Sequence, residues 1–333
     1  MSNTRGRTAW TLAVAVPALF AVALLIGRYG IRIEETFRVL FGLDGVSDVF
    51  RALVLRVRLP RALAAACIGA NLAVTGAAFQ GLFRNPLVDS RILGVSSGAA
   101  FGAAVALLFS AGTIGLQVSA FGFAMLAVGL VFVIGLRFGS APLVLVIGGL
   151  LVSALFNALL GLIKYLADPL STLPAITYWL LGGLSRTSWI HTVPLATMTG
   201  FGLLFFLAVR WRLNVLTLSD AEASGLGVRV RGLRLAVVGV GTVLVASSVA
   251  VAGMIGWIGL VVPHVARAWV GPDHGKLIPV SAALGAATLL ALDTIARNAI
   301  ATEIPLGILT GLIGVPAFLL LFLRFLRSKG EAQ

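Results

Sequence analysis

Residues 61–82 read RALAAACIGANLAVTGAAFQGL, an apolar run that carries no charge after its first residue. An α-helix needs about 20 such residues, each rising about 1.5 Å, to cross roughly 30 Å of hydrocarbon. The run meets that length and therefore predicts a transmembrane helix. Since 59% of the 333 residues are hydrophobic and only 11% are charged, far from the composition of a soluble domain, we extend the same test along the whole chain.

The test gives ten apolar segments and predicts an all-α, polytopic membrane protein with a single transmembrane domain over residues 1–333. The segments are residues 8–27, 61–82, 92–110, 118–136, 142–163, 191–209, 235–255, 257–270, 277–296 and 305–323. The eighth is short and contains Pro263. Arg5 and Arg7 before the first segment imitate a secretion signal, but because the chain starts at Met1 we expect this segment to remain as the first span.

Several classes of function find no support in the sequence. Cys67 is the only cysteine, which excludes intrachain disulfides and cysteine-based metal clusters. The three histidines, His191, His264 and His274, are too far apart to predict a metal centre, and we expect no cofactor. The net charge of +13 does not predict nucleic-acid binding, because the arginines are spread over loops instead of lining one face.

The sequence also lacks a complete nucleotide-binding loop and a set of ion-coupling carboxylates. Residues 271–277, GPDHGKL, lack the first glycine of a phosphate-binding loop and its Ser or Thr for magnesium, so the chain does not hydrolyse nucleotide by itself. Intramembrane carboxylates of the kind that couple transport to ions are nearly missing. Asp293 is the exception, and it lies one turn before Arg297, a spacing at which the two side chains can simply pair.

The distribution of basic residues sets the expected orientation. With the N-terminus inside, ten spans return the C-terminus to the inner side, where Arg324, Arg327 and Lys329 agree with the positive-inside rule. The outer loop, residues 28–60, resists this rule. Including the first residue of the next span, its arginines are Arg28, Arg32, Arg38, Arg51, Arg56, Arg58 and Arg61. They predict an outer surface that receives an acidic partner; the alternative is a solvated loop near lipid headgroups.

The inner loop, residues 209–234, contains a short predicted helix. It comprises Ser219, Asp220, Ala221, Glu222, Ala223, Ser224, Gly225, Leu226 and Gly227. Ser219 and Glu222 have the spacing of a capping box, and Gly225 or Gly227 can take the left-handed conformation that ends a helix. A helix this short is marginal alone, so we expect it to pack against something else. The alternative is a surface turn of a connecting loop.

The order of the segments predicts two inverted repeats, helices 2–5 and 7–10. Residues 61–87 and 234–262 both begin at an arginine, continue as a glycine-dotted apolar helix and reach a proline-containing bend. Because the two sets start five spans apart, they enter the membrane from opposite sides, as in transporters whose pathway lies at a repeat interface. Glycines such as Gly69 and Gly76 predict close helix packing.

Six motifs in order resemble the FecCD permeases of iron-siderophore, haem and cobalamin ABC importers over nearly the whole chain. They are Arg58–Arg61 (RLPR), Gly76–Gln80 (GAAFQ), Arg84–Leu87 (RNPL), Ile92–Ala99 (ILGVSSGA), Ile258–Arg267 (IGLVVPHVAR), and Glu303–Gly307 (EIPLG) with Gly314–Pro316 (GVP).

The resemblance implies partners for the chain. They are a second permease subunit, either an identical copy or a related paralogue, a cytoplasmic ABC ATPase dimer, and an extracytoplasmic substrate-binding protein. Membrane lipid surrounds the assembly, and nucleic acid has no part in it. The location implied is a bacterial or archaeal plasma membrane, with both termini in the cytoplasm.

The resemblance also implies roles for particular residues. Ser219–Gly227 corresponds to the helix that couples to the ATPase. Arg58, Arg61 and Arg297 correspond to arginines that grip the binding protein. The gate corresponds to Asn85, Leu87 and Ser140, and the pathway lining to Ser153 and Asn157. Two alternatives stay open, since Asn85 before Pro86 is also a common turn signal, and Asn157 can serve only to bond a neighbouring helix.

The expected function is therefore that of a permease subunit of an ATP-driven importer, with no enzymatic activity of its own. A secondary carrier driven by an ion gradient is the alternative. The sequence does not distinguish a siderophore from haem or cobalamin as substrate.

Overall fold

Helices joined by turns and irregular segments make up the part of the chain that the computed structural model describes, with no strand there. It describes residues 2–330 apart from 28, 31 and 139–140, with the backbone alone for residues 2–13, 322 and 324–330. The elements are α1 (Ser2–Leu25), α2 (Ile33–Leu40), α3 (Asp48–Ala52), the π-helical turn η1 (Leu53–Arg58), α4 (Leu59–Leu82), α5 (Val95–Leu108), α6 (Gly112–Phe138), α7 (Pro142–Leu166), α8 (Thr172–Leu180), α9 (Trp189–Leu216), α10 (Asp220–Gly225), α11 (Val230–Ala252), α12 (Ile258–Val270), α13 (His274–Asn298) and α14 (Leu306–Gly330).

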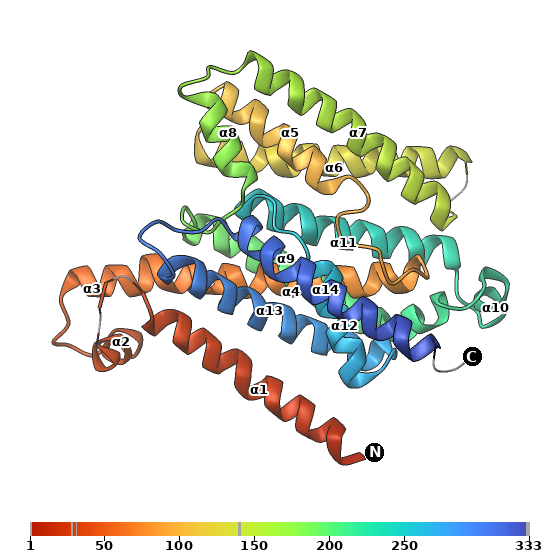
Figure 1. Ribbon diagram of the computed structural model, residues 1–333, viewed down its shortest axis with the longest axis horizontal. Coiled ribbons are helices and arrows are strands. Elements are labelled where there is room, and N and C mark those ends of the chain that lie inside the picture. The colour runs from red at the N-terminus through yellow and green to blue at the C-terminus, as the bar shows by residue number, and fades with distance from the viewer. Residues whose placement is uncertain (1, 28, 31, 139–140, 331–333) are drawn as a thin grey trace.

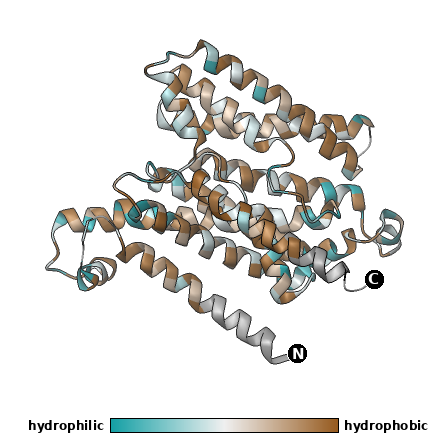
Figure 2. Ribbon diagram, viewed as in Figure 1, coloured by the Kyte–Doolittle hydropathy of each residue, from teal (hydrophilic) through white to brown (hydrophobic). Residues whose placement is uncertain are grey.

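Each of the ten predicted apolar segments coincides with a helix, so the all-α membrane architecture is confirmed. By length and composition, six helices of the described part can cross a membrane: the continuous helix Asp48–Leu82, α6, α7, α9, α11 and α13. Shorter apolar helices occupy Val14–Leu25, Val95–Leu108, Ile258–Val270 and Leu306–Leu321. Figure 2 shows apolar residues along the lengths of the helices and hydrophilic residues gathered towards their ends.

Helix α4 lies at the centre of the bundle, and 89% of its most apolar stretch is buried. It packs against α9, α11, α12 and α13. A Cβ added to Gly69 would overlap the carbonyl oxygen of Gly285, and one on Gly76 would overlap that of Gly259. The backbones of α4, α12 and α13 therefore approach each other as closely as the small residues allow, as the glycine pattern predicted.

The two ends of the bundle carry different short elements. Figure 1 shows α10 at the same end as the N-terminus of α1 and the end of α14, whereas α2 and α3 lie at the opposite end. We call these the α10 end and the α2 end. This placement agrees with the predicted topology, in which residues 28–60 and 209–234 lie on opposite sides of the membrane.

Part of the predicted repeat is visible in the helix pairs α4–α5 and α11–α12. Helix α4 starts at the α2 end and α11 starts at the α10 end, so they run in opposite directions (Figure 1). Each is followed by an irregular segment, residues 83–94 or 253–257, and then by a short helix of 14 or 13 residues.

The loops are more ordered than the sequence indicated. The predicted outer loop, residues 28–60, contains α2, α3 and η1, and α8 was not predicted. Helix α9 continues to Leu216 and α11 begins at Val230, so the inner loop is residues 217–229. The hydropathy pattern predicted that α9 ends before Arg210 and that α11 starts after Arg234, because charged residues leave the hydrocarbon. A helix can nevertheless continue beyond the hydrocarbon, as both of these do. Residues 271–277, which lack the pattern of a phosphate-binding loop, contain the start of α13. The Asp273 carboxylate caps this helix by accepting a hydrogen bond from the Gly275 N–H at 2.9 Å.

Candidate functional site

Helix α10 has the capping box that its sequence predicted. The Ser219 hydroxyl accepts a hydrogen bond from the Glu222 N–H at 3.2 Å, and the Ser219 N–H donates to the Glu222 carboxylate at 2.8 Å. The Ser219 hydroxyl also donates to the Glu222 carboxylate at 2.6 Å, and this bond together with that from the Ser219 N–H lowers the pKa of Glu222. Gly227, with φ +78°, follows the C-cap residue Leu226 in the left-handed conformation. The short helix is thus defined at both ends by its own residues.

Asp220 fastens α10 to the rest of the protein. Its carboxylate pairs with Arg84 at 2.8 Å and with the buried Arg234, at the start of α11, at 3.1 Å. Partial burial alone would raise the pKa of Asp220, but the hydrogen bonds and charges of Arg234 and Arg84 outweigh it and lower that pKa. Ala223, on the inward face of α10, is fully buried. The expectation that α10 packs against something else is confirmed.

The turn after α4, residues 83–88, holds two of the three predicted gate residues. Asn85 and Leu87 are exposed there, and the Asn85 amide oxygen accepts a hydrogen bond from the Leu87 N–H at 2.9 Å. Arg84, next to Asn85, has φ +49° and reaches α10 through Asp220. The third predicted residue, Ser140, lies outside the described residues. The structure therefore joins the predicted gate turn to α10 by a direct ion pair, a contact that the sequence did not predict.

The three predicted docking arginines lie at the α2 end, but they are buried. Arg58, Arg61 and Arg297 are each at most 8% exposed. The Arg58 guanidinium donates to the carbonyl oxygens of Leu24 at 2.8 Å and Tyr29 at 2.6 Å, and so binds the end of α1.

Arg61 and Arg297 share one carboxylate. Arg61 pairs with Asp293 at 2.8 Å and with Glu303 at 2.9 Å. Arg297 pairs with Asp293 at 3.2 Å, as the spacing of the two residues predicted, and also donates to the carbonyl oxygen of Ala23 at 3.1 Å. We call Arg58, Arg61, Asp293, Arg297 and Glu303 the arginine cluster. It ties α1, α4 and α13 together, and its most accessible side chain is Glu303.

The two predicted lining residues lie one turn apart on α7. Ser153 is half-buried, and its hydroxyl approaches Gly94 at the start of α5. Asn157 is exposed on a face of α7 that is otherwise apolar and includes Leu150 and Leu151. In this single subunit they line no described cavity, so their face is open to lipid or to another chain.

One buried polar contact escaped the sequence analysis. The guanidinium of Arg267, in α12, donates to the side-chain oxygen of Gln80 in α4 at 3.0 Å. The Gln80 amide donates in turn to the carbonyl oxygen of Val88 at 3.3 Å, within the turn that follows α4. The sequence does show Gln80 and Arg267 as polar residues within apolar helices, but it could not show that they pair, because that contact depends on the tertiary fold.

Comparisons with known proteins agree with one another. The FecCD transport family matches residues 14–324. The molybdate import system permease protein MolB of Haemophilus influenzae is 39% identical over 92% of both chains. The cobalamin import system permease protein BtuC of Halobacterium salinarum is 42% identical over 83% of this chain and 75% of its own. A metal-chelate type ABC transporter, solved in an inward-facing conformation, superposes with a TM-score of 0.87 at 36% identity, covering 95% of this chain and 98% of the other.

Proposed function

This chain belongs to the FecCD transport family and is a permease subunit of an ABC importer, and we propose that it conducts a metal chelate under the control of α10. The observation that carries this proposal is the ion pair between Arg84 and Asp220 at 2.8 Å. It connects α10, the short helix of one loop, directly to the turn that contains Asn85 and Leu87. A push on α10 would therefore move that turn.

The ATPase, a separate cytoplasmic dimer, hydrolyses the nucleotide and contacts the α10 end. Most residues of Ser219–Gly227 are exposed and available for this contact, whereas Asp220 and Ala223 hold the helix to the permease. Both termini and α10 then lie in the cytoplasm, and the assembly lies in the plasma membrane of a prokaryote. The permease contributes no catalytic residue.

The pathway lies between two permease subunits, identical or related. The exposed apolar face of α7 suits contact with a second subunit, and Ser153 and Asn157 provide isolated polar groups on that helix. Asn85 and Leu87 form the gate at the α10 end, with Ser140 as a further candidate. Weakly interacting walls of this kind let a bulky ligand slide past.

The binding protein docks at the α2 end through Arg58, Arg61 and Arg297. Because these arginines are bonded within the chain, docking requires an exchange of partners. Glu303 is the partner that can leave, since its side chain is 28% exposed and Arg61 retains Asp293 when it does. Acidic groups of the binding protein would take the position of the Glu303 carboxylate.

We expect Glu303→Gln to strengthen attachment of the binding protein several-fold. The substitution removes the internal competitor for Arg61 and leaves the Arg61–Asp293 pair in place. Surface plasmon resonance with the cognate binding protein on the immobilised complex measures the effect. Glu34→Gln is the matched control, because Glu34 is exposed at the same end and pairs only with Arg38 among the described residues. Equal or weaker attachment with Glu303→Gln would show that the arginine cluster is structural only.

The proposed substrate is a metal chelate, such as an iron siderophore, haem or cobalamin. The similarity to cobalamin and metal-chelate transporters supports this class, while the molybdate relative extends it to a metal oxyanion. Purification of the binding protein that attaches to the α2 end, followed by metal analysis and mass spectrometry of its ligand, identifies the substrate. A ligand that contains no metal would contradict the proposed class.

A further inference from the structure

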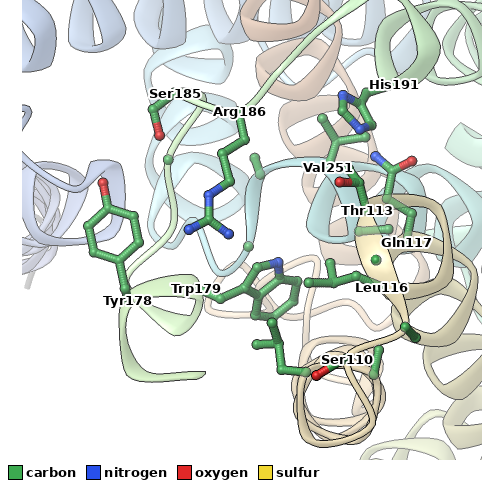
Figure 3. A pocket seen from close by; sticks show the side chains of 18 residues that line it. Ser110, Thr113, Leu116, Gln117, Tyr178, Trp179, Ser185, Arg186, His191 and Val251 are labelled. Atoms are coloured by element: carbon green, nitrogen blue, oxygen red, sulfur yellow. The ribbon is translucent and has the colours of Figure 1, made fainter. Parts of the chain in front are cut away.

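A cavity of about 360 Å³ lies at the α2 end, away from the arginine cluster. The end of α5, the start of α6, α8 and the end of α11 surround it. Its polar lining includes Thr113, Gln117, Tyr178, Trp179, Arg186 and His191. Figure 3 shows Arg186, Tyr178 and Trp179 on one side and Thr113, Gln117 and His191 on the other. The volume is in the range of small-molecule sites.

The cavity is electropositive. Arg186 is its charged member, and no carboxylate belongs to the described residues that line it. The guanidinium lies 6.0 Å from the centre of the Tyr178 ring, a cation–π contact that holds it at the cavity without neutralising its charge. No ion pair of Arg186 occurs among the described residues. Arg186 is exposed and lines the cavity, so its positive charge is available to a ligand there.

The remaining groups are mostly hydrogen-bond donors. The Nδ1 atom of His191 accepts the Ser188 N–H at 3.1 Å, so the neutral imidazole carries its proton on Nε2. His191 is 94% buried within the cavity wall, given its 6% exposure, and it presents that N–H as a donor. Trp179 adds an indole N–H, and Gln117 adds an amide. Gly112 and Thr113 line the cavity at the start of α6, where the helix dipole also favours negative charge.

We infer that this cavity binds a small oxyanion of about the size of sulfate or molybdate. An oxyanion has several acceptor oxygens and a negative charge, which match a guanidinium and three neutral donors on opposing walls. All the residues that line the site come from this chain, and the inference does not depend on which substrate is transported.

Equilibrium dialysis tests the inference directly. The full-length permease, held in nanodiscs of uncharged phosphatidylcholine, is dialysed against radiolabelled sulfate and, separately, labelled molybdate at low ionic strength. We expect saturable binding with one site per chain. Arg186→Gln should weaken it by at least about tenfold, the effect of losing charge-assisted hydrogen bonds. Gln117→Leu should weaken it less.

Arg56→Gln is the matched control, since Arg56 is exposed on η1 and does not line the cavity. It removes the same charge and should leave binding unchanged. Circular dichroism and gel filtration verify that each variant is folded. The inference fails if the wild type shows no saturable binding of either anion, if Arg186→Gln binds as tightly as the wild type, or if the two arginine variants weaken binding equally, because the last result would reflect net charge alone.

Discussion

Arg61→Glu is expected to prevent the permease from accumulating in folded form. The wild-type guanidinium is buried and pairs with two carboxylates, those of Asp293 and Glu303. Breaking a buried ion pair by removing one partner costs about 3–5 kcal/mol. Glutamate would in addition place a third carboxylate beside the first two, so the loss should exceed this range and approach the whole stability of a typical domain. Fluorescence-detected gel filtration of the solubilised protein measures the folded fraction.

Two further variants make this prediction specific. Arg51→Glu reverses a half-exposed arginine at the same end that has no ion pair among the described residues, and it should accumulate normally. Arg61→Met combined with Glu303→Gln should recover part of the folded fraction, since Asp293 keeps Arg297 as its partner and no uncompensated carboxylate is left beside it. If Arg61→Glu alone accumulates and melts like the wild type, Arg61 is not held as the structure describes. Loss of uptake in Arg61→Glu therefore cannot by itself demonstrate docking.

Asp220→Ala is expected to lower ATP-driven uptake by about tenfold or more per folded permease. The substitution releases Arg84 and Arg234 together, so α10 loses its connection to the turn that contains Asn85. Loss of about 1–3 kcal/mol of coupling between two sites changes their linkage by about 5–150-fold. The measurement compares uptake and ATP hydrolysis in vesicles that contain the whole importer. We expect hydrolysis to continue without proportional transport.

Thr217→Ala is the control for Asp220→Ala. Among the described residues the Thr217 hydroxyl bonds only the carbonyl oxygen of Asn214, and Thr217 lies outside Ser219–Gly227, so its loss should leave uptake near the wild-type rate. Wild-type uptake in Asp220→Ala would show that α10 drives the gate turn by some other route.

The pH dependence of this connection follows from the lowered pKa of Asp220. A carboxylate with a depressed folded pKa stabilises the structure above its ordinary pKa and loses that contribution as the pH falls through the folded value. The connection between α10 and Arg84 is therefore intact at neutral pH, and only strong acidification would imitate the loss of charge at Asp220.

The features that the sequence predicted well depend on neighbours along the chain. Each of the ten segments located by hydropathy coincides with a helix, because each is an apolar run along the chain, and six of these helices are long enough to cross a membrane. The capping box of α10 and the pairing of Asp293 with Arg297 were predicted for the same reason, since their partners lie three and four residues apart.

The features that escaped prediction depend on the tertiary fold. Arg61 and Glu303 are 242 positions apart, so their pairing could not be seen in either motif alone. The three arginines predicted to dock a partner were expected at the surface of the α2 end, whereas the fold surrounds them with carboxylates and carbonyl oxygens. Trp257, with φ +68°, opens α12 in a conformation that a side chain rarely adopts and that no local pattern indicates.

Uptake by vesicles that contain the purified permease alone tests the central claim most directly. The claim is that this chain is a passive conduit, and that ATP hydrolysis on another subunit moves its gate through α10. With binding protein and substrate outside and ATP inside, the account predicts no concentration of substrate until the ATPase is added. Concentrative uptake without the ATPase, abolished by an ionophore, would contradict it and identify a carrier driven by an ion gradient.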